Sequence, residues 1–156
     1  MVKAFKNVKT DKKLVIAGGS SDTDSFMMEL KELAKDDDRI IFIGFVQGQL
    51  LDELYSNAYI YTLPSDLEGM PLSLLEAMSY GNCCLVSDIS ECTEVVENKA
   101  LIFKKSDVDE LREKLQDACD HPEKVMEMKA QATDFICKKY NWDEVVKETM
   151  KLYMRK

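Results

Sequence analysis

The sequence has little of the residues on which several common functions depend, histidine and arginine first. Of its 156 residues, one is histidine and three are arginine, and 29 acidic residues outnumber 21 Lys and Arg, which gives a formal net charge of −8 at pH 7. Proteins that bind nucleic acid normally present a basic face that neutralises phosphates. We therefore expect no nucleic-acid partner.

Long apolar runs are absent as well. The longest apolar stretches, such as residues 40–46, are well short of the roughly 20 residues that span a bilayer. Residues 1–13 contain several lysines and no apolar core of the kind found in signal peptides. We therefore expect no transmembrane segment and a cytoplasmic protein.

The cysteines do not form a pattern known for metal sites or disulfides. Their number is odd, five, no two of them make a Cys-x-x-Cys pair, and His121 is the single histidine. Cys83 and Cys84 lie in an apolar run, where a thiol acts as a small hydrophobic group. We expect no metal site and a reducing compartment.

What the sequence does contain is a regular alternation of short strand patterns with longer helix patterns. Its 46% of apolar residues suffice for one core, and its 156 residues fit one domain. Strands are expected at residues 13–17, 39–44, 58–63, 83–87 and 100–103. Between and after them, helices are expected at residues 26–34, 48–56, 71–80, 90–97, 108–120, 122–139 and 142–154.

Several of the strands are apolar at consecutive positions, which is typical of parallel strands covered by helices on both faces. We predict an α/β fold: one Rossmann-like domain over residues 1–156, with three α/β/α layers around a parallel sheet. Residues 4–8 have the pattern of a helix end, whereas such a domain normally begins with a strand. We therefore expect its first strand to be missing from this chain.

The most informative stretch, residues 63–81, follows a strand and opens a helix, where open α/β sheets bind ligands. Gly69 allows unusual backbone angles and close approach to a ligand, and Pro71 suits a first helical turn. The amides of Met70, Leu72 and Ser73 are expected to be free to donate to an anion at the helix N-terminus. A pyrophosphate would fit there.

Two glutamates flank this turn with Glu-x7-Glu spacing. Glu76 lies on the polar face of the expected helix, where its carboxylate could accept hydrogen bonds from the vicinal hydroxyls of a ribose. Glu68, in the preceding loop, can face a polar group held at the same helix end. In a chain with 29 acidic residues such pairs are common, so the spacing alone also fits two solvated glutamates.

In its wider context the segment resembles the donor-binding signature of retaining glycosyltransferases of the GT-B fold, family 4. The resemblance covers nearly the whole chain. The elements that match in order are residues 14–19 (Leu-Val-Ile-Ala-Gly-Gly), 41–46 (Ile-Phe-Ile-Gly-Phe-Val), 55–58, 64–65 with 68–69, 85–88, 94–96 and 140–142. The last of these opens a terminal helix like the one that crosses back toward the N-terminal domain of such enzymes, and we expect it to dock on an existing surface.

The resemblance implies roles for single residues. Glu68 would be the catalytic glutamate beside the donor sugar, and Glu76 would bind the nucleotide ribose. The other implied donor-binding residues are Gly69, Met70 and Pro71 for sugar hydroxyls, Leu72 and Ser73 for the diphosphate, Gly44, Phe45 and Val46 for the base pocket, and Gly18 at the neighbouring strand end. Such enzymes usually need no divalent metal and no other cofactor.

The resemblance also implies what the whole protein does. It would be a hexosyltransferase of polysaccharide biosynthesis that transfers hexose from UDP-, GDP- or ADP-hexose to a saccharide or lipid-linked acceptor, with retention of configuration. Its place would be the cytoplasm or the inner face of the membrane. The chain would be the C-terminal half of the GT-B fold, of little or no activity alone, because the N-terminal acceptor domain and a basic pair facing the diphosphate lie upstream of it.

Two other hypotheses about function remain beside this one. A non-catalytic nucleotide-sugar-binding or interaction module would keep the same fold and both glutamates. A phospho-receiver domain shares the alternation of strands and helices, but it needs an acidic cluster after its first strand, where residues 14–19 end in glycines. The sugar, the base, the acceptor and the oligomeric state stay open.

Overall fold

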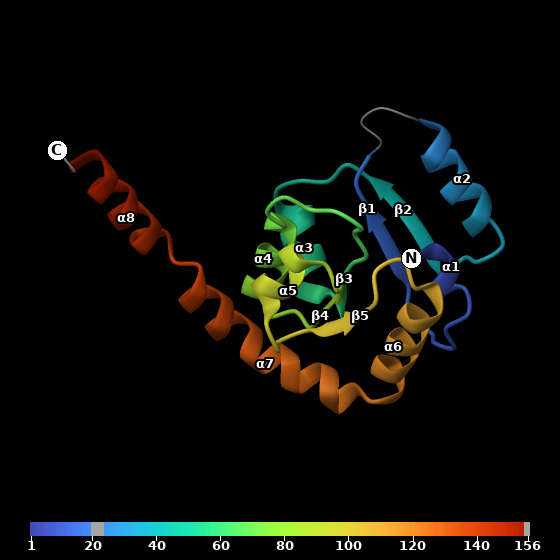
Figure 1. Ribbon diagram of the computed structural model, residues 1–156. Coiled ribbons are helices and arrows are strands. Elements are labelled where there is room, and N and C mark those ends of the chain that lie inside the picture. The colour runs from blue at the N-terminus through green and yellow to red at the C-terminus, as the bar shows by residue number, and fades with distance from the viewer. Residues whose placement is uncertain (20–23, 155–156) are drawn as a thin grey trace.

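The computed structural model describes residues 1–19 and 24–154, and it has the alternating α/β order that the sequence predicts (Figure 1). The strands are β1 (Leu14–Ala17), β2 (Ile40–Gly44), β3 (Tyr61–Leu63), β4 (Cys84–Ser87) and β5 (Leu101–Phe103). The helices are α1 (Val2–Phe5), α2 (Asp24–Ala34), α3 (Gln49–Asn57), α4 (Leu72–Ser79), α5 (Ser90–Val96), α6 (Val108–Asp120), α7 (Pro122–Lys139) and α8 (Trp142–Met154).

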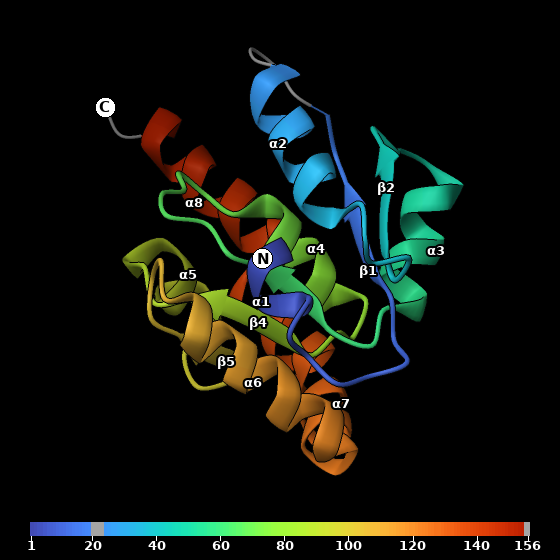
Figure 2. The ribbon, with the colours of Figure 1, turned by 90° about the vertical axis from the view of Figure 1, so that its right-hand side faces the viewer.

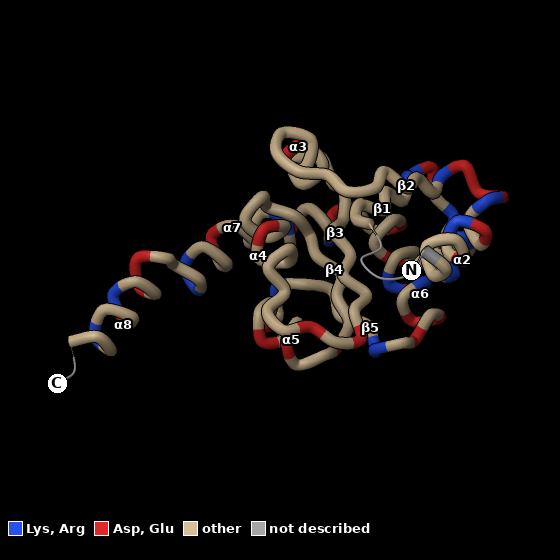
Figure 3. The backbone as a smooth tube through the Cα atoms, turned by 90° about the horizontal axis from the view of Figure 1, so that it is seen from above, with Lys and Arg blue, Asp and Glu red and all other residues tan. Residues whose placement is uncertain are grey.

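All strand pairs are parallel, but hydrogen bonds divide the strands into two sheets instead of one. β1 pairs with β2, and β3, β4 and β5 form the second sheet in that order. β1 and β3 lie at the facing edges of the two sheets, as Figure 1 and the view from above in Figure 3 both show. Within the described residues, nothing pairs with either of these inner edges.

The three layers are clearest around β4, which is buried along its whole length. Its alternate side chains point to opposite faces. Cys84 and Val86 pack with residues of α3, α4, α5 and α7, whereas Leu85 packs on the other face with residues of α1, β5 and α6. The predicted α/β/α architecture with parallel strands is confirmed.

Helix α1 connects the two sheets. Its Val2 and Phe5 are buried against α2, β1 and β2, while Ala4 packs with β4, β5 and α6. Figure 2 shows α1 between β1 and β4. The helix predicted to end at residue 8 ends at Phe5, and Val8 is buried beside it.

Two further predictions need correction. β3 begins at Tyr61 and not at residue 58, because its register with β4 starts with Tyr61 opposite Cys84. α8 was expected to dock, yet every described residue of it is exposed and it extends away from the domain (Figure 1). In the described part of the chain, none of the helices is long and apolar enough to cross a membrane.

Candidate functional site

Most of the predicted donor-binding residues lie at or after the carboxyl ends of β1, β2 and β3. Gly18 follows β1 and donates its N–H to the carbonyl of Gly44, the last residue of β2, at 2.8 Å. Gly44 has φ of 70°, in the left-handed region that favours glycine. Next to it Phe45 is 76% exposed and Val46 is half-buried, so both side chains are at least partly accessible to solvent.

The loop after β3 holds Glu68 through two serines. Ser87, buried at the end of β4, donates its hydroxyl to the carbonyl of Ser65. The Ser65 hydroxyl in turn donates to Oε1 of Glu68 at 2.6 Å, and Glu68 is half-buried. These bonds fasten the loop and one carboxylate oxygen to the neighbouring strand. The other oxygen, Oε2, has no hydrogen-bond partner among the described residues.

The turn into α4 differs from the prediction in three ways. The helix begins at Leu72, after a buried Pro71. The Leu72 amide is not free, because it already donates to the carbonyl of Met70 at 2.8 Å. Gly69 has no positive φ, and a Cβ placed there would meet nothing within 4 Å. Gly69 therefore provides open space in front of the helix rather than an unusual turn.

Two backbone donors remain at this helix start. In residues 1–19 and 24–154, no backbone acceptor bonds to the amides of Met70 or Ser73. The N-terminus of a helix carries a partial positive charge and unpaired N–H groups, which together favour an anion. The anion site predicted from sequence thus keeps two of its three expected amides.

Glu76 lies one turn further along α4 and is exposed. Its Oε2 accepts a hydrogen bond at 3.1 Å from the hydroxyl of Tyr55, which is on α3. On the same helix face Ser73 accepts a hydrogen bond at 2.8 Å from the hydroxyl of Tyr61 on β3. The two polar side chains of α4 that the sequence singles out are therefore each held by a tyrosine.

Neither tyrosine had a predicted role, although Tyr55 opens residues 55–58, one of the elements that resemble the family. Tyr55 is 8% exposed, its ring centroid lies 5.9 Å from that of Tyr61, and its ring stacks on Tyr80 at 5.4 Å. Burial raises the pKa of Tyr61 to about 12 and that of Tyr55 well above its ordinary value, so both hydroxyls stay protonated donors at neutral pH. The signal that could have revealed them is aromatic residues on the elements flanking α4.

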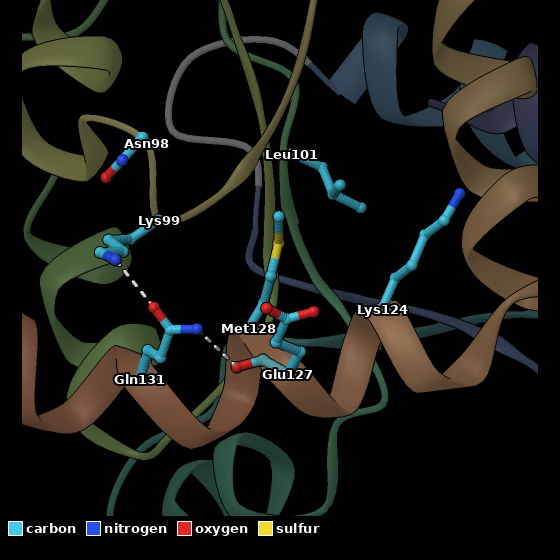
Figure 4. A pocket seen from close by; sticks show the side chains of 7 residues that line it. All are labelled: Asn98, Lys99, Leu101, Lys124, Glu127, Met128 and Gln131. Carbon is cyan, nitrogen blue, oxygen red and sulfur yellow. Dashed lines mark hydrogen bonds between the residues drawn. The ribbon is translucent and has the colours of Figure 1, made fainter.

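A hollow of about 310 Å³ lies elsewhere, at the amino-terminal end of β5, and its lining includes Lys99, Leu101, Lys124 and Met128 (Figure 4). Lys99 donates to the side chain of Gln131 at 2.7 Å, so polar groups of this hollow bond to each other. None of the predicted site residues lines it. Because ligands of open α/β sheets bind beyond the carboxyl ends of the strands, we place the candidate site at the opposite edge.

In the part of the chain that the structure describes, no three His, Cys, Asp or Glu side chains cluster in a way that could hold a metal ion. The candidate site consists of two carboxylates and two backbone amides around the start of α4. Of the predicted residues, Gly18 and Gly44 lie at the ends of β1 and β2, whereas Glu68 and Glu76 lie on the loop and the helix that follow β3.

Comparison with known proteins finds relatives that are similar in sequence to this chain. The chain is 29% identical over 147 residues to an uncharacterized glycosyltransferase of Methanocaldococcus jannaschii, and 28% identical over 144 residues to O-antigen chain mannosyltransferase B of Escherichia coli. Each match covers 90% of this chain and 36% of the relative. The chain thus spans about a third of the length of these relatives.

The fold is shared with a solved structure, that of Anabaena Alr3699/HepE in complex with UDP and glucose. The TM-score is 0.89 at 14% identity, over 97% of this chain and 43% of that one. The model of the family described as glycosyl transferases group 1 matches residues 1–135. Because this model covers most of the chain, the chain belongs to the glycosyl transferases group 1 family.

Proposed function

We propose that this chain binds the nucleotide-sugar donor of a retaining glycosyltransferase, and that the whole protein transfers a hexose from it to a saccharide or lipid-linked acceptor. The observation that carries the proposal is the start of α4, where the amides of Met70 and Ser73 lie between Glu68 and Glu76 in the chain. This arrangement offers donors for a diphosphate and acceptors for sugar hydroxyls on either side of it.

Each group then has a role. The Met70 and Ser73 amides and the dipole of α4 meet the charge of the diphosphate, which grows as the sugar departs. Glu76 accepts the ribose hydroxyls. The Oε2 of Glu68, whose other oxygen is held by Ser65, faces the donor sugar and acts beside the reacting carbon. Open space at Gly69 admits the sugar, and Gly18, Gly44, Phe45 and Val46 line the nucleotide end.

The proposed substrates follow in part from the relatives. One is named as a mannosyltransferase of O-antigen chains, and a structure of the same fold contains UDP and glucose. A hexose donor with UDP, GDP or ADP as carrier and a polysaccharide acceptor are consistent with both. We propose further that donor binding needs no divalent metal, since backbone amides of this chain can meet the diphosphate charge.

The proposal includes a further strand and a further domain of the whole protein. β1 and β3 present unpaired inner edges that face each other, and both sheets are parallel. A strand of the whole protein that precedes α1 would join the two sheets, as the connectivity of a doubly wound fold requires. The acceptor site and the opposite wall of the cleft would belong to an N-terminal domain, so this chain alone would turn over poorly.

The experiment is a calorimetric titration of the chain with UDP, GDP, ADP and their hexose conjugates, in the presence and absence of EDTA. One nucleotide should bind saturably and equally well with EDTA. Glu76→Ala should weaken it at least tenfold, because a hydrogen bond to a charged group is worth about 1.5–3 kcal/mol. The matched control is Glu94→Ala, at an exposed position of α5. Equal affinity of Glu76→Ala and wild type would refute the role of Glu76.

A second candidate function is a binding module without catalysis. It is favoured by the composition of the candidate site, because none of its predicted residues is Lys or Arg and a basic group is the usual partner of a leaving diphosphate. Incubation of the whole protein with the nucleotide sugar that binds separates the two functions. Release of free hexose or its transfer supports the enzyme, and tight binding without either supports the module.

A further inference from the structure

Tyr55 is a polar residue packed among mostly apolar side chains. Tyr55 is 8% exposed and belongs to the cluster that also contains Leu74, Met78 and Val86. A buried hydroxyl is costly unless it finds a partner. Here its partner is the carboxylate of Glu76, 3.1 Å away, with the Ser73 carbonyl as a more distant acceptor at 3.4 Å.

This hydrogen bond joins two elements that are far apart in the sequence. Tyr55 lies on α3 and Glu76 on α4, 21 residues later. The Tyr55 ring cannot move easily, because it stacks on Tyr80 and lies tilted against Tyr61. The hydroxyl of Tyr80 is itself held by Asp52 of α3 at 2.6 Å. The donor to Glu76 is therefore rigid, whereas Glu76 is exposed and without this bond would sample several rotamers.

We propose that Tyr55 is a positioning residue for nucleotide binding, whose hydroxyl holds the Glu76 carboxylate in the orientation that accepts the ribose hydroxyls. The inference rests on the proposed function, because it assumes that Glu76 binds ribose. A carboxylate has about four lone-pair sites, so a bond from Tyr55 to Oε2 leaves acceptor positions on both oxygens for a vicinal diol. Tyr55 itself does not touch the nucleotide.

The test is Tyr55→Phe, which removes the hydroxyl and keeps the ring. Titrations use whichever of UDP, GDP and ADP binds wild type, together with the 2′-deoxy and 3′-deoxy forms of the same nucleotide. Affinity for the ribonucleotide should fall roughly threefold to tenfold, since the lost bond acts through a second residue. Affinity for the deoxy forms should fall less, because fewer ribose hydroxyls depend on the orientation of Glu76.

A double variant makes the test independent of overall stability. In the background of Glu76→Ala, Tyr55→Phe should cause no further loss, since the side chain it positions is gone. The matched control is Tyr59→Phe, which also removes one tyrosine hydroxyl. The Tyr59 hydroxyl donates to the carbonyl of Ala118 at 2.8 Å and bonds to neither Tyr55 nor Glu76. This variant should bind the nucleotide like wild type.

The outcomes separate this inference from the proposed function. If wild type binds none of the nucleotides, or if Glu76→Ala binds like wild type, the proposed role of Glu76 fails and the inference fails with it. If Glu76→Ala loses affinity while Tyr55→Phe does not, the function stands and the positioning role is wrong. An equal loss for ribose and deoxyribose forms, or a loss that persists without Glu76, means that Tyr55 only supports the fold, which also overturns the inference.

Discussion

Asn82 ties together the two helices that carry the candidate ribose site, and its removal should cost measurable stability. Its side chain is 1% exposed, and its Nδ2 donates to the carbonyls of Tyr55 at 2.8 Å and of Ala77 at 3.0 Å. These carbonyls lie near the C-termini of α3 and α4, where intrahelical partners run out. The amide group thus serves as a shared cap for both helices.

The size of the effect follows from these two bonds. Each intramolecular hydrogen bond contributes about 0.5–1.5 kcal/mol net, so Asn82→Ala should lower the free energy of unfolding by about 1–3 kcal/mol. Each carbonyl keeps one other donor, the Ala58 amide for Tyr55 and the Asn82 amide for Ala77, which limits the loss. For a domain of this size, a loss of about 2 kcal/mol lowers the melting temperature by roughly 4–8 °C.

Asn82→Asp should be worse, and its defect should depend on pH. The substitution places a carboxyl oxygen against two carbonyl oxygens in a buried position, which disfavours the charged form and raises the pKa of the introduced carboxyl in the folded state. The folded state then holds its proton at a pH where the unfolded chain has lost it. The extra instability therefore grows as the pH rises through the ordinary range of a carboxyl group, near 4, and is relieved in acid.

The assay is urea unfolding followed by circular dichroism at pH 4 and pH 7 for wild type and both variants. The control is Asn57→Ala, where an exposed amide donates to the carbonyl of Glu53 and its loss should change stability by less than about 0.5 kcal/mol. Equal stability of Asn82→Ala and the control variant, or an equal defect of Asn82→Asp at both pH values, would refute this role of Asn82.

Two more predictions concern groups outside the site. Arg39 donates to both carboxylate oxygens of Asp37, at 2.9 and 2.7 Å, and these bonds lower the pKa of Asp37 from 3.8 to about 2. The stability contributed by the Asp37 carboxylate is complete above pH 3.8 and is lost as the pH falls toward 2. In Asp37→Asn the free energy of unfolding should therefore fall less steeply with pH in that window. The same slope as in wild type would contradict this. With a thiol reagent at pH 8, exposed Cys137 should react first and half-buried Cys119 more slowly. Cys83, Cys84 and Cys92 are buried, and burial raises the pKa of all three thiols, to about 11 for Cys83 and Cys92. These three should react only after unfolding. Reaction of all five cysteines at one rate in the folded protein would contradict this packing.

Much of the fold could be predicted because it depends on local patterns in the sequence. The order of strands and helices, the parallel α/β class and most element boundaries depend on apolar periodicity within short segments, and these predictions are confirmed. The loop and helix that carry Glu68 and Glu76 could be located for the same reason. Their roles toward a donor stay predictions, because no contact within the chain tests them.

The errors in prediction occurred where distant parts of the chain decide the outcome. The start of β3 at Tyr61 depends on its register with β4, and the lost Leu72 amide depends on how the turn closes on Met70. The expected docking of α8 assumed that an apolar face must be covered, but its Trp142 and Tyr153 are 78% and 83% exposed. A periodic pattern shows that a face is apolar and does not show what lies against it.

The sequence by itself determined the class of fold, the family resemblance and the two glutamates. Each of these depends on short segments and their order along the chain, which can be recognised without knowing how the chain folds. The tertiary structure alone decided that the strands divide into two sheets, that Ser65 and Ser87 hold the loop of Glu68, and that Tyr55 holds Glu76. A hydrogen bond between residues 21 positions apart on different elements leaves no periodic trace. Helix packing decides which residues come within hydrogen-bonding distance, and no local pattern in the sequence predicts it.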